Sequence, residues 1–278
     1  GLNYTYGRGY YQELNDLWYD QNVSLSGKTS AAYLMLPDES ATEIENVTQK
    51  WLDNDFYVAN LMTRFQKRKQ TLHLGLSFSS YVGDHFGTLI WAQNAGRALP
   101  DHRFYENQGK KTDANVFAKF THAIGTRWKL FADMQYRWVD YAVSGMQAGQ
   151  IPINVDRYYG FFNPKGGLTY SINTNQQAYF SVARANKEPN RTDFENGNPS
   201  AEELIDFELG WRVTQPMFQF SANAYFMDYT NQLVLTGAID EVGAPIRTNS
   251  GSSYRTGMEF DLNWVLNTQW KWQSNMSL

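Results

Sequence analysis

The sequence lacks cysteine, long apolar runs and a marked excess of charge of one sign. None of its 278 residues is cysteine, which excludes a disulfide framework, a thiolate metal site and a cysteine nucleophile. No run of about 18 apolar residues occurs, so a membrane-spanning helix is excluded. The formal net charge is −4, and such a balance gives no reason to expect nucleic acid as a partner.

Catalytic and metal-binding motifs are also missing. The four histidines are His73, His85, His102 and His122. No two of them have the HxH or HExxH spacing of a metal site, and the chain has no GxSxG motif, no phosphate-binding loop and no GxGxxG ahead of a helix. His85 and His102 share one predicted connection with Asp84 and Asp101, but we predict no metal there. The sequence therefore predicts no enzyme, no catalytic residue and no cofactor.

The chain does not open on a basic segment followed by an apolar one, so no signal peptide is predicted. Residues 1–6 instead read directly as a strand. Two interpretations stay open at this point: a targeting segment has been removed, or the chain is an internal piece of a longer protein.

What the sequence does have is a repeated alternation of apolar and polar residues. In 71–82, Leu72, Leu74, Leu76 and Phe78 share one face, because successive side chains of a strand point to opposite sides. Further strands are predicted at 2–14, 53–65, 113–123, 127–141, 160–172, 176–186, 203–213, 218–228, 254–264 and 269–278. The chain is thus predicted to be all-β with about eleven strands, and only 30–50 suggests a helix.

The predicted connections alternate strictly between short and long. The short ones lie at 66–70, 124–126, 173–175, 214–216 and 266–268, and the long ones at 15–52, 83–112, 142–159, 187–202 and 230–252. In an up-and-down meander, odd and even connections lie at opposite ends of the sheet. This asymmetry is typical of transmembrane antiparallel β-barrels, which have short periplasmic turns and long extracellular loops. The clear strands, at about 10–13 residues, also match the 9–11 needed to cross a bilayer.

Charge is confined to one face of the clear strands. The uncharged sides are those of 72–78, 116–120, 128–138, 205–213, 218–226 and 256–264. Lys or Arg on a lipid face costs about 2–4 kcal/mol, which explains the absence. Trp128 and Trp138 stand at strand ends, where a ring meets the membrane–water boundary. We predict that the apolar face meets lipid, whereas charged residues such as Asp133 and Glu259 face a wet lumen.

The long connections are rich in rings and hydrogen-bonding groups. Such a mixture suits capture of a ligand by flat, amphipathic surfaces. The predicted ligand-binding residues are Trp91, Tyr105, Tyr158, Tyr159, Tyr229 and Arg247. The alternative is that these side chains only pack the loops against one another.

One short connection is strongly basic. It contains Lys67, Arg68 and Lys69, which we interpret as a solvated turn near anionic head groups. The run is too short to indicate nucleic-acid binding.

Residues 178–211 carry motifs of a known family. A strand ends in an Arg-x-Pro-like loop, an Asn-Pro segment with an acidic residue follows, and the next strand contains Glu-x-Gly. The matching residues are Arg184, Pro189, Asn198, Pro199, Glu202, Glu208 and Gly210. Ala201 stands where the family usually has a second proline. Together with 225–262, this stretch resembles the barrel of TonB-dependent outer-membrane receptors, in particular those of Bacteroidetes.

The resemblance implies a location in the bacterial outer membrane and active import of a scarce ligand. Such receptors close 22 strands around an N-terminal plug and release the ligand inward when TonB pulls on the plug. Their usual cargo is a ferric siderophore or other metal chelate, cobalamin, haem or a glycan. Besides TonB, outer-membrane lipid and a surface lipoprotein are partners that the resemblance allows.

The resemblance also implies that 1–278 is one partial barrel domain, with about half of the strands. The plug, the TonB-contacting segment and the C-terminal strands are expected to be absent, since the sequence stops inside a strand at Ser277-Leu278. Two alternatives to the importer stay open: a passive outer-membrane porin and a soluble β ligand-binding protein.

Overall fold

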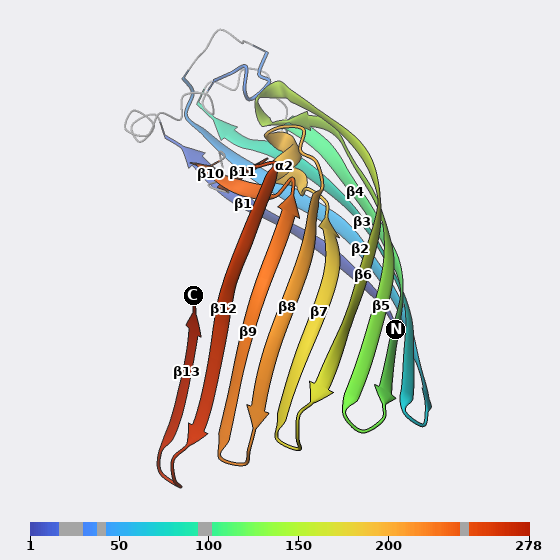
Figure 1. Ribbon diagram of the computed structural model, residues 1–278. Helices are drawn as coiled ribbons and strands as arrows, with labels where there is room; N and C mark the ends of the chain where they lie inside the picture. Colours follow the sequence, from blue (N-terminus) through green and yellow to red (C-terminus); the bar gives the residue numbers. More distant parts are fainter. Residues whose placement is uncertain (17–29, 38–42, 94–101, 240–244) are drawn as a thin grey trace. The chain divides into compact units, whose positions relative to one another are not determined.

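The computed structural model describes residues 1–16, 30–37, 43–93, 102–239 and 245–278. Eleven strands form one antiparallel sheet, in the order β1 to β9, then β12 and β13 (Figure 1). They are β1 (Leu2–Asn15), β2 (Asn46–Lys67), β3 (Gln70–Ala92), β4 (His102–Ile124), β5 (Trp128–Gln147), β6 (Ile151–Ser171), β7 (Gln176–Lys187), β8 (Glu202–Thr214), β9 (Phe218–Thr230), β12 (Ser252–Val265) and β13 (Lys271–Ser277). The predicted all-β meander of about eleven strands is confirmed.

Short elements fill the remaining connections. Strands β10 (Leu233–Ile239) and β11 (Pro245–Asn249) pair in a separate two-stranded sheet. Among the described residues, the helices are α2 (Arg191–Glu195) and the 3₁₀ turn η2 (Ala148–Gln150). In the part of the chain that the structure describes, no helix has the length and apolar character needed to span a bilayer.

Several strands are much longer than the sequence pattern predicts. Strand β3 has 23 residues and continues to Ala92, although the alternation ends near Val82. The predicted long connections 83–112 and 142–159 are therefore wrong, because most of their described residues belong to β3, β4, β5 and β6. Polar residues such as Asp84 and Glu106 interrupt the alternation there. The backbone ladder continues because it does not depend on side-chain polarity.

The suggestion of a helix within 30–50 is not met in the described part of that segment, of which 38–42 lie outside the description. Residues 31–35 form a turn, and β2 begins at Asn46. Met35 has φ 53°, which ends the turn after the bond from Leu34 N to Ser30 O. The helix α2 lies instead in the predicted connection 187–202, where the Asn190–Asp193 capping box starts it.

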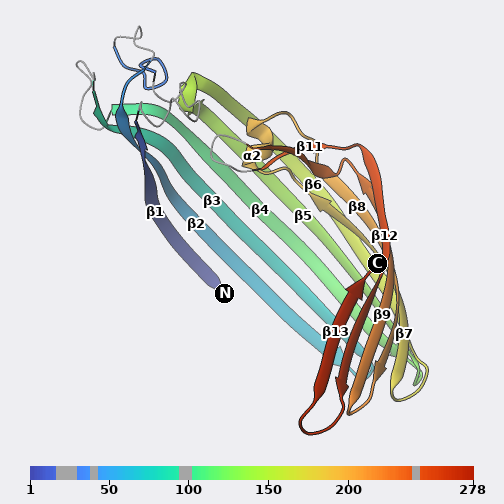
Figure 2. The ribbon, with the colours of Figure 1, turned by 90° about the vertical axis from the view of Figure 1, so that its left-hand side faces the viewer.

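The chain divides into two compact units. Unit 1 contains Gly1–Asn60, Ser77–Ala114 and Trp138–Tyr158, and unit 2 contains Leu61–Leu76, Asn115–Arg137 and Tyr159–Leu278. Figure 2 shows β1 to β4 following one another as neighbours. In unit 1 a small core forms where residues 31–36 and Ile44 pack on β3 and β4. Its buried residues are Ala31, Leu34, Leu36, Ile44, Leu89, Ala92 and Phe104.

The register in unit 2 aligns side chains of one kind on each face. Leu209, Ala224 and Met258 stand opposite one another across β8, β9 and β12. Arg212 and Asp261 belong to a row on the other face. Leu209 is 61% exposed and Met258 45% exposed, so this apolar face is not buried in a core. Exposed apolar surface of this extent indicates a surface that meets another apolar phase.

Aromatic rings lie over glycines of neighbouring strands in unit 2. A Cβ at Gly210 would overlap the ring of Tyr179, whose hydroxyl donates to Asn223 Oδ1 at 3.0 Å on the next strand but one. The same arrangement joins Gly75 to Phe117, Gly167 to Phe131 and Gly257 to Tyr225. Glycine is required at these positions because any side chain would occupy the space of the ring.

Candidate ligand-binding site

A hollow of about 600 Å³ lies in unit 1 along β1, β2 and the neighbouring parts of β3 and β4. Its lining residues are Gly7, Arg8, Gly9, Tyr10, Tyr11, Lys50, Trp51, Leu52, Asn54, His85 and Tyr105. This size falls within the range of about 300–1,000 Å³ that small-molecule sites occupy. Aromatic rings, one side-chain amide and two cations thus surround one cavity.

Lys50 is the main charged group of the hollow. Its side chain is only 9% exposed, and Nζ lies 3.2 Å from Glu13 Oε2 and 5.6 Å from the ring centroid of Tyr11. A buried ammonium needs such partners because burial of an unpaired charge is costly. An ammonium has three donors, so the Glu13 carboxylate does not exhaust its capacity. The pair can therefore hold a further oxygen acceptor.

Glycines open the floor of the hollow. A Cβ at Gly9 would meet no atom within 4 Å, whereas one at Gly7 would lie 2.9 Å from Asn54 Oδ1. The register pairs Gly7 with Asn54, Gly9 with Leu52 and Tyr11 with Lys50, so these residues share one face of the β1–β2 ladder. The missing side chains leave space above the backbone that a ligand can occupy.

A second hollow, of about 520 Å³, belongs to unit 2 and has a different character. Its lining includes Leu61, Leu74, Leu76, Val116 and Met134. These side chains are on the apolar face of β2 to β5, and they offer almost no hydrogen-bonding groups. The hollow is therefore suited to hydrocarbon and not to a polar ligand.

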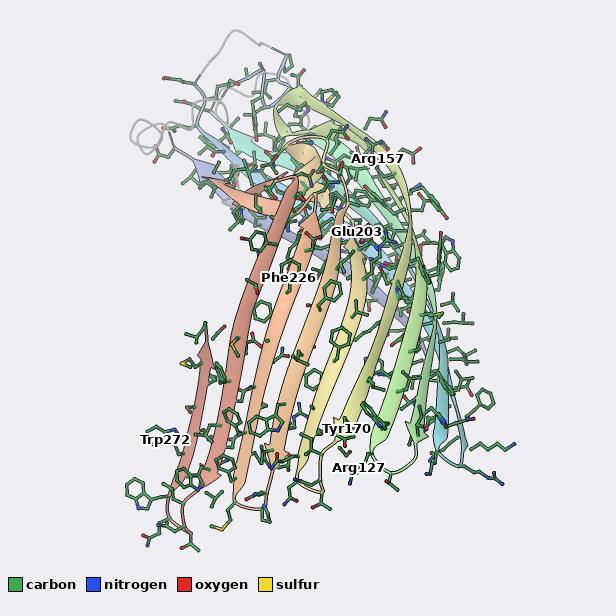
Figure 3. All side chains as sticks on the ribbon, in the orientation of Figure 1. Arg127, Arg157, Tyr170, Glu203, Phe226 and Trp272 are labelled. Atoms are coloured by element: carbon green, nitrogen blue, oxygen red, sulfur yellow. The ribbon has the colours of Figure 1, made fainter. Side chains whose placement is uncertain are left out.

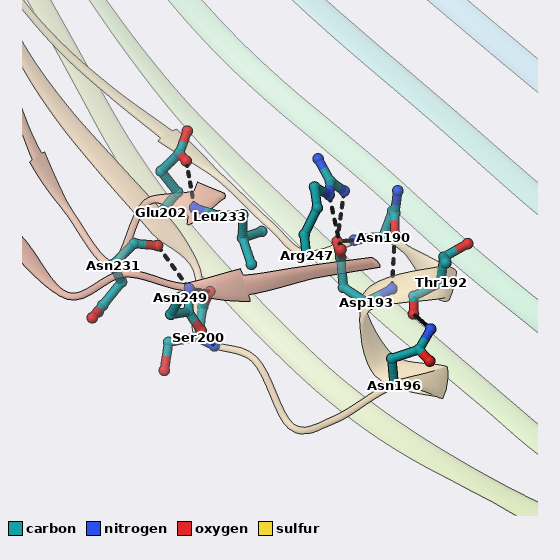
Figure 4. Close-up of polar contacts among 10 residues, drawn as sticks. All are labelled: Asn190, Thr192, Asp193, Asn196, Ser200, Glu202, Asn231, Leu233, Arg247 and Asn249. Carbon is teal, nitrogen blue, oxygen red and sulfur yellow. Dashed lines mark hydrogen bonds and ion pairs between the residues drawn. The ribbon is translucent and has the colours of Figure 1, made fainter. Parts of the chain in front are cut away.

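In unit 2, helix α2 is fastened to β11 by a buried ion pair (Figure 4). Arg247 Nε and Nη2 donate to the two carboxylate oxygens of Asp193 at 3.0 and 2.7 Å. The Asp193 side chain is 1% exposed, and it also accepts from Asn190 N. Such a bidentate pair has fixed geometry, so the guanidinium is committed to the helix.

A second set of bonds closes the same region. Asn249 Nδ2 donates to Ser200 O at 3.1 Å and to Asn231 O at 2.7 Å, and Glu202 Oε2 accepts from Leu233 N at 2.9 Å (Figure 4). The connection between β7 and β8 is therefore tied to the connection between β9 and β12. We call these bonds, with the Asp193–Arg247 pair, the loop clasp.

Residues 1–278 match the family model described as TonB dependent receptor-like, beta-barrel. The chain belongs to the TonB-dependent receptor β-barrel family. The receptor barrel is thus an outer-membrane structure of bacteria, in a family of receptors and transporters, and the soluble alternative is excluded.

Solved structures show the same fold at low sequence identity. The receptor barrel is similar to the ferric yersiniabactin uptake receptor FyuA of Yersinia pestis (14% identity, TM-score 0.58) and to the alcaligin receptor FauA of Bordetella pertussis (16%, 0.53). It is also similar to the copper transporter OprC (13%, 0.62). The chain is covered to 84%, 84% and 83%, and it spans only 36%, 39% and 39% of those chains. No curated protein sequence matches it.

The faces of the receptor barrel follow from its family. The apolar face meets lipid, so the unit 2 hollow beside Leu74 lies in the hydrocarbon layer, while the polar face lines the lumen. The turns between β2 and β3 and between β4 and β5 are periplasmic. Figure 3 shows Tyr170 and Trp272 near the short turns, where rings border the membrane. Alternation along β2 sets Lys50 and Asn54 opposite the lipid-facing Leu61, on the lumenal face.

Five of the six predicted ligand residues lie in strands of the eleven-stranded sheet, so their assignment to loops is wrong, whereas Arg247 lies in β11, within the connection between β9 and β12. Trp91 is the last residue but one of β3 and is 48% exposed, and Tyr158 in β6 is 67% exposed. Tyr159 in β6 stacks on Phe161 with ring centroids 5.4 Å apart. Tyr105 in β4 lines the unit 1 hollow. Their role in ligand binding stays a prediction.

Two of the six predicted ligand residues, Tyr229 and Arg247, contact other residues of unit 2. Tyr229 is buried in β9, with Arg255 Cζ 5.3 Å from its ring centroid. Arg247 belongs to the loop clasp. These contacts favour the alternative for both residues, namely packing of the connections against one another.

The sequence pattern missed Lys50, Tyr11 and Asn54. Lys50 fell inside the predicted connection 15–52, whereas it belongs to β2. The available signal was Gly7-x-Gly9-x-Tyr11, which places two glycines and a ring on one face of a strand. Among the described residues, no group of His, Asp and Glu could hold a metal ion, and Asp101 lies outside that description.

Proposed function

We propose that the complete protein imports an oxygen-rich metal chelate, which binds first at the unit 1 hollow. The observation that carries the proposal is the buried Lys50, paired with Glu13 and set among the rings of Tyr11 and Tyr105. A cation with spare donors recognises an anionic chelate, and the rings supply flat contact area. The similar structures named above include a ferric yersiniabactin uptake receptor and a copper transporter, which supports this ligand class.

Import would need parts beyond these residues. We propose that a plug and the remaining strands complete the transport path, and that the TonB complex drives release through the plug. A surface lipoprotein that presents the ligand is a further proposed partner. Uptake of the bound ligand by cells with and without TonB tests the coupling. Uptake that persists without TonB would support the passive porin instead.

Ligand identity is tested by titrating the intact receptor with ferric citrate, a ferric catecholate chelate, cobalamin and an oligosaccharide. We expect a ferric chelate to bind most tightly. Lys50→Met removes a hydrogen bond to a charged group, which is worth about 1.5–3 kcal/mol, so Kd should rise at least tenfold. Tyr105→Leu should weaken binding by a smaller factor.

The matched control is Lys110→Met in β4. Lys110 is exposed and does not line the hollow, so its removal changes net charge equally without touching the site. Equal weakening by both lysine variants would show that only general electrostatic attraction is involved. Tightest binding of cobalamin or of the oligosaccharide would replace the chelate as cargo.

A further inference from the structure

The periplasmic end of unit 2 carries cations without acidic residues. Strand β2 ends at Lys67, the β2–β3 turn carries Arg68 and Lys69, and the β4–β5 turn carries Arg127. We call these four residues the basic rim. No Asp or Glu occurs in residues 56–83, 114–132 or 157–187, which include the three turns at this end of β2 to β7. The rim is thus a patch of one sign, although the whole chain has a net charge of −4.

Hydrogen bonds hold the first turns of the rim side by side. Lys69 Nζ donates to Gly125 O at 2.8 Å, and Ala123 N donates to Lys69 O at 2.9 Å. These two bonds join the β2–β3 turn to the β4–β5 turn. Arg127 Nη1 reaches the hydroxyl of Tyr170 in β6 at 3.2 Å, and Figure 3 shows these two residues at the turn end. The cations therefore belong to one surface.

The rim is exposed and its charge is not neutralised. All four side chains are exposed, and within the described residues none forms an ion pair with a carboxylate. The bonds of Lys69 and Arg127 go to neutral oxygens. Unpaired like charges repel one another, so an anionic partner would relieve the repulsion.

The rim adjoins the lipid-facing surface. The tilted rings of Trp128 and Tyr170 lie with their centroids 4.5 Å apart, directly beside Arg127. Rings of this kind mark the boundary between hydrocarbon and head groups. We propose that the basic rim binds the phosphate groups of anionic phospholipids in the periplasmic leaflet of the outer membrane. Arg and Lys recognise phosphate, and the adjacent apolar face accommodates the acyl chains.

The experiment compares lipids retained by the intact receptor in neutral detergent, with phosphatidylglycerol and phosphatidylcholine added together and counted by native mass spectrometry. Each Lys or Arg near an anionic surface strengthens attraction about fivefold, so the wild type should prefer phosphatidylglycerol. The variant K67Q/R68Q/K69Q/R127Q should lose at least tenfold of that preference. Raising salt should weaken the preference of the wild type, because exposed charges are screened.

Two matched variants control for general effects. K67R/K69R/R127K keeps every charge and should retain the preference. Lys271→Gln removes one cation of β13 at the same end, outside the rim, and should also retain it. An unchanged preference in the quadruple variant would overturn the proposal. The proposal would also be overturned if the quadruple variant kept its lipid preference but no longer bound a soluble acidic peptide. That result would assign the rim to a periplasmic protein.

Discussion

Single glycines decide how rings pack on the lumenal face of the barrel. The Tyr179 ring occupies the space that a side chain at residue 210 would fill, and its hydroxyl reaches Asn223 across β8. One missing Cβ therefore permits a contact between strands β7 and β9, which are not neighbours in the sheet. The Gly75–Phe117 pair shows the same relation between adjacent strands.

Gly210→Val should destabilise the folded receptor. The new side chain must displace the Tyr179 ring and break its bond to Asn223, and such overpacking costs about 1–3 kcal/mol. The loss is measured as a lower urea midpoint in detergent, with an unchanged slope.

Gly197→Ala is the matched control for that substitution. A Cβ at Gly197 meets nothing within 4 Å, so we expect a change within about 0.5 kcal/mol. If both variants unfold at the same urea concentration, the packing of the Tyr179 ring does not depend on Gly210.

At the scale of secondary-structure elements, the loop clasp fixes the position of the short helix α2. Helix α2 has only five residues, which is too short for independent stability. Its capping box and the Asp193–Arg247 pair replace the missing helical bonds. Hydrogen bonds and an ion pair between side chains therefore help to order the connections around it.

Asp193→Asn should release α2 from β11. The substitution keeps the size of the side chain but leaves the Arg247 guanidinium without its anion, and breaking a buried pair costs about 3–5 kcal/mol. Hydrogen exchange of 191–195 should accelerate strongly, while the long strands keep their protection.

Glu195→Gln in the same helix provides the comparison. It breaks the Arg191–Glu195 pair, which is partly exposed and separated by one helical turn. Pairs of that kind contribute about 0.3–0.5 kcal/mol, so exchange should change little. Comparable acceleration in both variants would contradict the assigned role of Asp193.

The elements could be predicted only where a strand has two different environments. Leu74 and Phe78 alternate with polar residues because one side of β3 faces lipid, and this part was predicted from the sequence. Around Asp84 and His85 the strand no longer has a purely apolar face, so the pattern disappears while the backbone pairing continues to Ala92. For the same reason the sequence analysis assigned Lys50 to a predicted connection, together with Trp51 and Leu52 of the candidate site.

At the scale of the whole molecule, the lipid-facing surface excludes charged side chains, whereas the lumenal surface accepts them. Ala222→Arg places a charge on the apolar face, between Trp211 and Phe260 in the register. We expect the free energy of unfolding from lipid vesicles to fall by about 2–4 kcal/mol, as for Arg at the bilayer midplane. Urea titration of the intact receptor in vesicles measures the loss.

Ser221→Arg is the control on the adjacent residue. Ser221 lies on the lumenal face between Arg212 and Asp261, where one like and one opposite charge offset each other. Folding should therefore change by less than about 1 kcal/mol. A larger cost for Ser221→Arg than for Ala222→Arg would reverse the assignment of the two faces.

The strands that continue past the alternating segments have a consequence for recognition. Lys50 and Tyr105 are mounted on a hydrogen-bonded ladder, so they already hold their positions before any molecule arrives. Ligand binding then costs little conformational entropy, because no mobile segment has to become ordered. Such a receptor would select between ligands by their fit to a preorganised site. A change of ligand would then require different side chains on the same strands, and not different loop conformations.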